Sequence, residues 1–251
     1  MGSGQFYMTL PSNSSMSVFP SNTLSEYKVK LPEHVNLTGN WEVGLASITY
    51  PHTWFNVQRQ KCHFYYDRGD DGGVIVGVIP DGYYSMHEVV STINKLLVDD
   101  GVKGILLQLD KRSQKVTVTV GKSQRFGFTE NLAIILGFET ATILNKTTTA
   151  PFMSGLNIAL QSLYVYLNIV ETQIIGDVRA SLLRIVPAQG KSGEIITLNY
   201  DNPQYVPLST RDFEVLEVLI TDDTGKKVPF ERGRVVITLN FRLRQLPYFS
   251  S

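Results

Sequence analysis

Short runs of strand-forming residues, each ended by glycine, aspartate, asparagine or proline, recur along most of the chain of 251 residues. The stretch 163–187, LYVYLNIVETQIIGDVRASLLRIVP, is typical, with apolar runs on both sides of a Gly-Asp break. No helical period runs through such segments, and strand formers dominate them. Many short strands with turn signals between them predict a β-sandwich or a β-barrel.

One predicted strand, over residues 41–50, follows a break at Gly39 and should lie at the centre of a sheet. We expect Trp41, Val43, Leu45 and Ile48 to be largely buried in it. The other predicted strands cover residues 5–10, 26–31, 63–66, 74–79, 105–110, 115–120, 156–168, 181–186, 194–198, 215–221 and 235–243.

Helices are expected at only two places. Ser85 and Glu88 have the S-x-x-E spacing of a capping box, and the apolar residues that follow share one helical face. A shorter helix is expected after Thr129, ending at Gly137. A hairpin is predicted between the two helices. Residues 81–140 are therefore expected to form a helix–hairpin–helix subdomain, either inserted into the β-domain of residues 5–251 or accessory to it, while residues 1–4 resemble a cloning remnant.

Composition makes several partners poor candidates. The chain has 23 Lys and Arg and 23 Asp and Glu, so its formal net charge is zero. Proteins that bind the phosphate backbone usually carry a basic excess, so no direct contact with nucleic acid is expected. The apolar stretch 163–187 is interrupted by charged residues, so no membrane insertion is expected. The single cysteine, Cys62, excludes an intrachain disulfide and fits synthesis in a reducing compartment such as the cytoplasm.

Residues with catalytic or metal-binding chemistry are scattered. The four histidines have no metal-ligand spacing, and no second cysteine could complete a zinc site. Cys62 and His63 are neighbours, so in a strand their side chains point to opposite faces and cannot form a nucleophile–base pair. We therefore expect no enzyme activity, no catalytic residues, no cofactor and no metal.

One acidic loop has two alternative interpretations. Asp67, Asp70 and Asp71, with the glycines among them, suggest a calcium loop, but their spacing differs from that of an EF-hand. A solvated hairpin tip explains the same residues more simply. The loop also contains Arg68, Gly69 and Asp70, a tripeptide that is only a weak candidate for a receptor-binding loop because short matches arise by chance.

The front half of the chain is rich in aromatic residues. A row of them on a sheet could stack on sugar rings, so a carbohydrate- or receptor-binding β-sandwich is the alternative function. Packing in the core or in an interface is the more ordinary use of such residues. A hydrolase on a β scaffold is a third class, but no set of residues supports it. The aromatic residues considered are Phe6, Tyr7, Trp41, Tyr50, Trp54, Phe55, Tyr65, Tyr66, Tyr83 and Tyr84.

The sequence resembles a known family along nearly its whole length, from about Phe6 to Arg242. The front end has F-Y-x-T-L-P-S-N-S-S, then F-P-x-N-T, then L-x-G-x-W-E-V-G-L-x-x-I-x-Y-P. Together with LYVYLNIVETQIIGDVRASLLRIVP and VLITDDTGKKVPFERGRVVITLNFR, these motifs resemble the minor capsid, penton-type protein of Polinton/Maverick virus-like transposons, which are related to adintoviruses.

The resemblance implies a single jelly-roll fold and a structural role in a virion. A protein of this family is expected to form a homopentamer at the vertices of an icosahedral capsid, among copies of a double jelly-roll major capsid protein. The nucleus of the host cell is a candidate place of assembly. The stretch 81–140 is additional to a minimal jelly roll of eight strands.

Two regions are candidate subunit interfaces. One is the N-terminal arm, where Phe6, Tyr7 and Phe19 must be covered by something. The other is the connection at Gly176, where Asp177 and Arg179 carry charge between two predicted inner strands, 163–166 and 182–186. The alternatives are an arm folded onto its own subunit and a plain solvated turn, in which an exposed ion pair contributes little.

Overall fold

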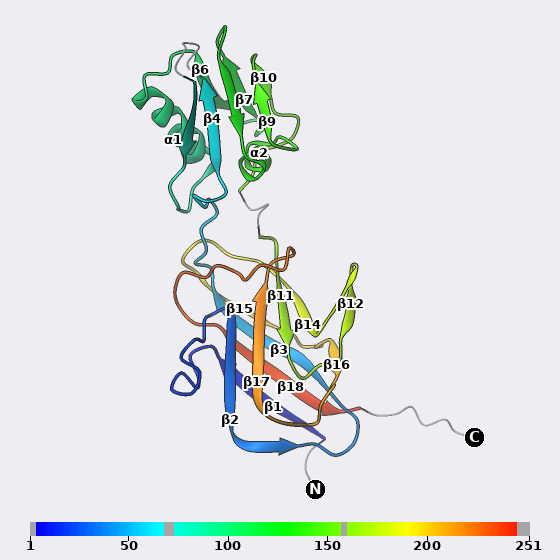
Figure 1. The fold of residues 1–251 in the computed structure, drawn as a ribbon. Coiled ribbons are helices and arrows are strands. Elements are labelled where there is room, and N and C mark those ends of the chain that lie inside the picture. The colour runs from blue at the N-terminus through cyan, green and yellow to red at the C-terminus, as the bar shows by residue number, and fades with distance from the viewer. Residues whose placement is uncertain (1–3, 68–72, 157–159, 245–251) are drawn as a thin grey trace, which may run out of the picture. The chain divides into compact units, whose positions relative to one another are not determined.

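The computed structural model describes residues 4–67, 73–156 and 160–244 (Figure 1). The chain divides into two compact units. Residues 1–54 and 160–251 belong to the first, which we call the sandwich unit, and residues 55–159 form the second, which we call the insert unit.

The described residues of the sandwich unit form two large antiparallel sheets and a small two-stranded one. The first has the order β1–β18–β3–β15, with β16 also paired to β3, and the second has the order β14–β11–β17–β2. The bounds of the first sheet are Gln5–Pro11 (β1), Val236–Leu243 (β18), Trp41–Pro51 (β3), Ile195–Asn199 (β15) and Tyr205–Pro207 (β16). Those of the second are Leu182–Pro187 (β14), Ser162–Leu167 (β11), Asp212–Thr221 (β17) and Glu26–Asn36 (β2).

The strand order identifies a jelly roll. If β1, β2, β3, β11, β14, β15, β17 and β18 are numbered one to eight along the chain, the sheets have the orders 1-8-3-6 and 5-4-7-2. Two four-stranded sheets connected in this way have jelly-roll topology. The predicted fold class, a jelly-roll sandwich with a small α+β part, is confirmed.

Alternation of side chains builds the core between the two sheets. In β11, Leu163, Val165 and Leu167 are fully buried, while Tyr164 and Tyr166 on the other face are half-buried. This period of two is what a strand with one core face requires.

The central position predicted for residues 41–50 is confirmed. Strand β3 lies between β18 on one side and β15 and β16 on the other. Val43, Leu45 and Ile48 are fully buried, and Trp41 is half-buried. Strands β11 and β14 pair as expected for inner strands, but β14 lies at the edge of its sheet, so that part of the prediction was wrong.

The insert unit has its own core, two sheets and two helices. One sheet has the order β5–β4–β8–β9 and the other β10–β7–β6. The strands are His63–Asp67 (β4), Val74–Val78 (β5), Ile105–Leu109 (β6), Val116–Val120 (β7), Arg125–Phe128 (β8), Thr142–Leu144 (β9) and Thr148–Thr149 (β10). The helices are Met86–Asp99 (α1) and Glu130–Leu136 (α2). Phe64, Phe126 and Phe128 are buried in this core together with Ile93 of α1 and Leu132 of α2.

Both predicted helices and the hairpin between them are confirmed. Ser85 caps α1, with its hydroxyl accepting from Glu88 N–H and the Glu88 carboxylate accepting from Ser85 N–H. Gly137 ends α2 with φ of 89°, a left-handed conformation that favours glycine. Among the described residues, no helix has the length and apolar character needed to span a membrane.

Candidate subunit interface

The sandwich unit has two different flanks, each formed by one edge strand from each sheet. On one, which we call the arm flank, Tyr27 of β2 donates a hydrogen bond of 3.1 Å to the carbonyl of Leu10 in β1. On the opposite one, which we call the hairpin flank, β14 and β15 are the edge strands. There Tyr50, which pairs with Ile196 of β15, donates to the carbonyl of Pro187 at 3.2 Å. Unlike flanks are what a head-to-tail contact needs.

The predicted N-terminal candidates are not equivalent. The Phe6 ring stacks on Phe241 with a centroid distance of 4.8 Å and contacts Trp41 at 5.4 Å, so its own subunit covers it. Tyr7 is 61% exposed, and its hydroxyl accepts from Asn240 at 3.2 Å. Phe19 is half-buried. Because β1 pairs with β18 along its whole length, a deletion through Phe19 would remove a strand of the sheet as well as any interface.

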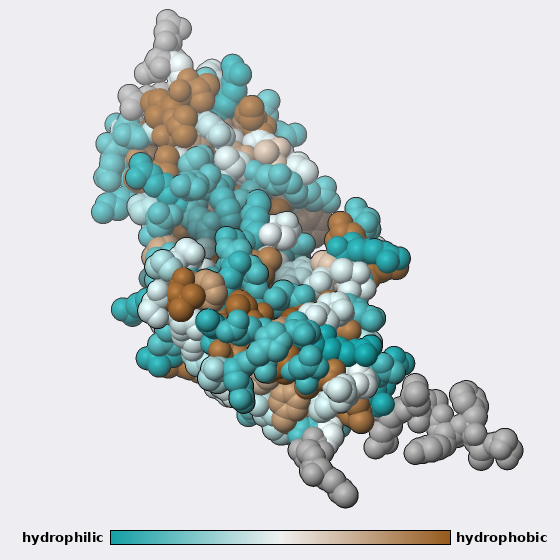
Figure 2. Space-filling view, turned by 60° about the horizontal axis from the view of Figure 1, so that its bottom comes forward, coloured by the Kyte–Doolittle hydropathy of each residue, from teal (hydrophilic) through white to brown (hydrophobic). Residues whose placement is uncertain are grey.

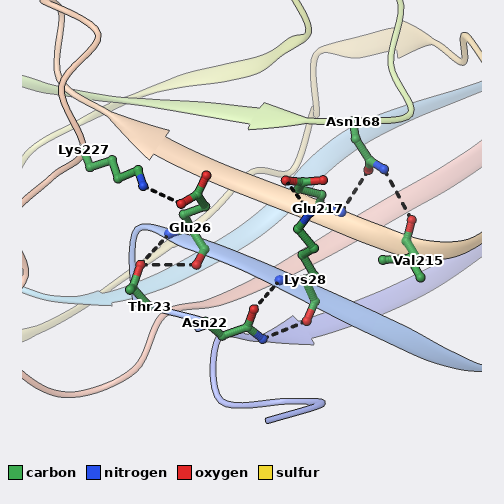
Figure 3. Close-up of polar contacts among 8 residues, drawn as sticks. All are labelled: Asn22, Thr23, Glu26, Lys28, Asn168, Val215, Glu217 and Lys227. Carbon is green, nitrogen blue, oxygen red and sulfur yellow. Dashed lines mark hydrogen bonds and ion pairs between the residues drawn. The ribbon is translucent and has the colours of Figure 1, made fainter. Parts of the chain in front are cut away.

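The segment after β1 closes the outer edge of β2 (Figure 3). Ile220 N–H donates to Ser25 O at 2.7 Å, so the backbone N–H and C=O groups of odd-numbered residues in β2 point toward β17. The backbone groups of Glu26, Lys28 and Lys30 therefore point away from β17, toward the open edge. Each outward residue meets a side chain of the arm. Thr23 bonds to the backbone of Glu26, Asn22 accepts from Lys28 N–H and donates to Lys28 O, both at 2.9 Å, and Ser15 accepts from Lys30 N–H at 3.0 Å.

Residues 14–23 are therefore folded onto their own subunit. Beside them, the charges of β2 are neutralised by ion pairs from Lys28 to Glu217 at 3.1 Å and from Lys30 to Glu214 at 3.2 Å. Glu26 also pairs with Lys227. Natural sheets block exposed edges against unwanted pairing by devices of this kind.

The hairpin flank has an exposed apolar hairpin. Strands Gln173–Ile175 (β12) and Val178–Ala180 (β13) form a separate two-stranded sheet, joined by Gly176 and Asp177. Ile174 and Val178 are 72% and 56% exposed. Gly176 has φ of 61° at the first turn position, where a type II′ hairpin requires glycine. An isolated two-stranded hairpin is marginally stable in water, so this one gains from a surface that covers it.

Backbone and side-chain bonds hold the base of the hairpin between the two sheets. Glu171 N–H donates to Pro207 O of β16 at 2.9 Å, and the Gln173 amide donates to Leu182 O of β14 at 2.5 Å. Asp177 lies in the turn of the hairpin and Arg179 in β13. Within the described part of the chain, neither forms an ion pair. Their charges are available to a partner.

The edge strands β14 and β15 carry further exposed apolar residues. Ile185 of β14 is 43% exposed and Ile195 of β15 is 75% exposed. Tyr164 lies next to Ile185 on the outer face of its sheet, because the two residues are register partners. Figure 2 shows one face of the molecule, where brown apolar patches lie among mainly hydrophilic side chains. Interfaces combine apolar and aromatic side chains with charges, and this flank carries both kinds.

The remaining candidate sites gain no support from the structure. The Asp67 carboxylate lies 4.0 Å from Arg125 Nε. The other residues of the acidic loop and of the candidate receptor tripeptide, Arg68, Gly69, Asp70 and Asp71, lie outside the described residues. No group of three or more His, Cys, Asp and Glu residues that could hold a metal occurs within the described ranges. Cys62 is buried, and this burial raises the pKa of its thiol, so the reactive thiolate is disfavoured.

The aromatic side chains do not form a sugar-binding row. Tyr50, Trp54 and Tyr66 are buried, and Phe6, Trp41 and Tyr84 are half-buried. The four that are more exposed come from separate segments of the two units: Tyr7, Phe55, Tyr65 and Tyr83.

Sequence reasoning missed the apolar side chains of the hairpin, although a signal was present. The run Gln-Ile-Ile-Gly-Asp-Val-Arg-Ala has strand formers on both sides of a Gly-Asp pair, which is typical of a two-residue hairpin. It was interpreted only as a charged connection.

Comparison with solved structures gives an informative match, whereas the sequence comparisons do not. No protein-family model matches the chain, and no curated protein matches its sequence. Among solved structures, the chain is similar to selenomethionine-labelled mavirus penton protein, with a TM-score of 0.55 and 12% identity. The match covers 95% of this chain and 99% of that one. A second match, to the D1-D2-D3 domains of the flagellar cap protein FliD from Escherichia coli, has a TM-score of only 0.17 and carries no argument. The chain therefore has a penton-like fold over nearly its whole length.

Proposed function

We propose that this chain is a structural, penton-type capsid protein that assembles as a closed ring of five copies at the vertices of an icosahedral particle. The observation that carries the proposal is the penton-like fold, which extends over both units and not only over a common sandwich core. The motifs of the front end support placing it in a Polinton/Maverick, adintovirus-related element. Its proposed location is the virion, after synthesis in the cytoplasm and assembly there or in the nucleus.

In the ring, the hairpin flank of each subunit contacts the arm flank of the next. A cyclic ring needs one surface that meets a different surface, and the two flanks of the sandwich unit fulfil this condition. The hairpin flank contributes Ile174, Val178, Asp177 and Arg179. The arm flank offers Tyr7 on β1, together with Met16 and Val18, which are 42% and 52% exposed.

The proposed partners are other copies of the same chain and a double jelly-roll major capsid protein that surrounds the vertex. No direct contact with nucleic acid and no enzymatic reaction are part of this function.

The proposal is tested by the mass and symmetry of the purified protein. Size-exclusion chromatography with light scattering should give a mass that is a multiple of five subunits, and negative-stain images should show five-fold rings. A monomer at micromolar concentration would count against the ring.

A further inference from the structure

The two longest edge strands of the insert unit differ in how their outer edges are treated. Strand β6 is blocked. Asp110 N–H donates to Lys115 O at 3.0 Å, so the backbone groups of Leu107 face away from β7. Asn94 of α1 meets both of them, donating to Leu107 O at 2.8 Å and accepting from Leu107 N–H at 2.9 Å. No further strand can pair at that residue.

Strand β5, at the edge of the other sheet, is open. Thr129 N–H donates to His63 O at 3.0 Å, so the backbone groups of odd-numbered residues in β4 form hydrogen bonds with β8. The backbone groups of Phe64 and Tyr66 form theirs with β5. Their partners are Gly77 and Ile75, which leaves the N–H and C=O groups of Val74, Val76 and Val78 facing outward. Among the described residues, no backbone or side-chain group bonds to these three.

The sequence of β5, Val-Ile-Val-Gly-Val, has none of the usual protections of an edge. It contains no charge and no proline, and its pairing with β4 has no bulge. Val74 and Val76 are 65% and 54% exposed. On the same outer face, Val76 is in register with Tyr65, and Tyr65 with Gly127, which is in turn in register with the 74% exposed Ile143. An open apolar edge next to an apolar sheet face is suited to strand addition.

We propose that β5 pairs antiparallel with β5 of a second copy, about a two-fold axis at Val76. In this register Val76 faces Val76 of the second copy, and Val74 faces its Val78. All three are residues whose backbone groups point outward, so the hydrogen bonds of the two edges match. The two four-stranded sheets become one continuous sheet, and the apolar row through Tyr65 continues across the axis.

The identity of the occupant follows from the self-complementary side chains. Ile75 comes opposite Gly77 of the second copy, so a large residue meets a small one in both directions. Gly77 lies over the Phe64 ring, where an added Cβ would stand 2.1 Å from it, so a side chain is excluded at this position. Neither strand brings a charge that would repel its equivalent. A contact of this kind is isologous and joins copies in pairs, so it links two rings and adds nothing within one ring.

The pairing is tested with cysteine substitutions in the full chain, at micromolar concentration under mild oxidation. Residues that exchange both backbone hydrogen bonds have Cα atoms about 5.5 Å apart, within the range of a disulfide. We expect Val76→Cys to form a disulfide-linked dimer on a non-reducing gel. Cys62 is 2% exposed and should not contribute.

The matched control is Val74→Cys, on the same strand and similarly exposed. Two copies of residue 74 would lie four residues apart along the paired strands, roughly 13 Å, and should not cross-link. Val74→Cys with Val78→Cys should cross-link again. Equal cross-linking of Val76→Cys and Val74→Cys would overturn the pairing. So would the absence of cross-linking in both Val76→Cys and the double variant. The edge would then be open to an extended segment of another protein. The gel detects the β5–β5 contact whether or not the ring of five forms. Failure of the pairing can therefore be distinguished from failure of the ring.

Discussion

The two flanks of the sandwich unit differ in what their own subunit supplies. On the arm flank, residues 14–23 cover the outer edge of β2 from Glu26 to Lys30, and the charges of Lys28 and Lys30 are paired within the subunit. On the hairpin flank, β12 and β13 project two apolar side chains and two charges that no other described residue neutralises. One flank is largely completed by its own chain, whereas the other is completed by a neighbour in the proposed ring.

The difference shows how an interface can be separated from an ordinary surface. Exposed apolar residues alone are common on soluble proteins. Ile174 and Val178 are exposed on opposite faces of a two-stranded hairpin, because Ile174 is in register with Arg179 and Val178 with Ile175. Such a hairpin has little stability of its own. A backbone bond to β16 and a side-chain bond to β14 fix its base and hold it in place for a contact.

The largest expected effect comes from making the hairpin polar. Ile174→Asp with Val178→Asp should abolish the ring and leave a folded monomer, because both side chains are mostly exposed in the subunit. Sedimentation velocity gives the oligomer and thermal melting gives the fold. Val98→Asp, at a 70% exposed position on α1 of the insert unit, is the matched control and should leave the ring intact. Equal loss of the ring in both variants would show that the hairpin has no special role.

Core truncation in β3 should have the next largest effect, on stability. Leu45 is fully buried at the centre of the first sheet, and Leu45→Ala should lower the free energy of unfolding by about 2–5 kcal/mol. Chemical denaturation measures this directly. An unchanged unfolding midpoint would contradict the central position of the strand.

Opening the arm flank should have a smaller effect. Asn22→Ala removes the side chain that bonds to both backbone groups of Lys28, and we expect a loss of about 1 kcal/mol. Hydrogen exchange at Lys28 should become faster at the same time. Asn36→Ala is a suitable control, because the Asn36 side chain is exposed and bonds to the Asp212 side chain at 3.3 Å. Slow exchange at Lys28 in the Asn22 variant would mean that the edge is protected in another way.

The charges of the hairpin should contribute least to the ring. Asp177→Ala with Arg179→Ala should weaken assembly a few-fold and leave thermal melting unchanged, since exposed ion pairs contribute less than about 1 kcal/mol. The effect should shrink as salt is added, because exposed charges are screened. A weakening that does not depend on salt would point to a conformational change of the turn.

A chelator should change neither the stability of the protein nor its assembly. Incubation with EDTA is expected to leave melting temperature and oligomer mass unchanged, because nothing within residues 4–67, 73–156 and 160–244 groups three metal-ligating side chains. A loss of several degrees would revive the acidic loop that begins at Asp67 as a calcium site.

Local sequence signals predicted much of the fold. The capping box at Ser85, the glycine after α2 and the burial of Val43, Leu45 and Ile48 in β3 are each set by neighbouring residues and proved correct. The edge position of β14 was missed, because strand order depends on contacts between residues far apart in the sequence.

The candidate site was predicted less well for a related reason. Phe6 was expected to need a neighbour, but β18 brings Phe241 against it from the far end of the chain. Ile174 and Val178 fell in what was interpreted as a charged connection, because composition does not reveal that their two short strands form a sheet of their own.

The most direct measurement of the account is native mass spectrometry of the wild-type protein at low micromolar concentration. With a subunit mass of 28.1 kDa, the ring predicts a species of five subunits, or of ten where β5 joins two rings. In Ile174→Asp with Val178→Asp, masses of five and ten subunits should disappear. A wild-type protein that remains monomeric, or that forms only dimers, would contradict the ring.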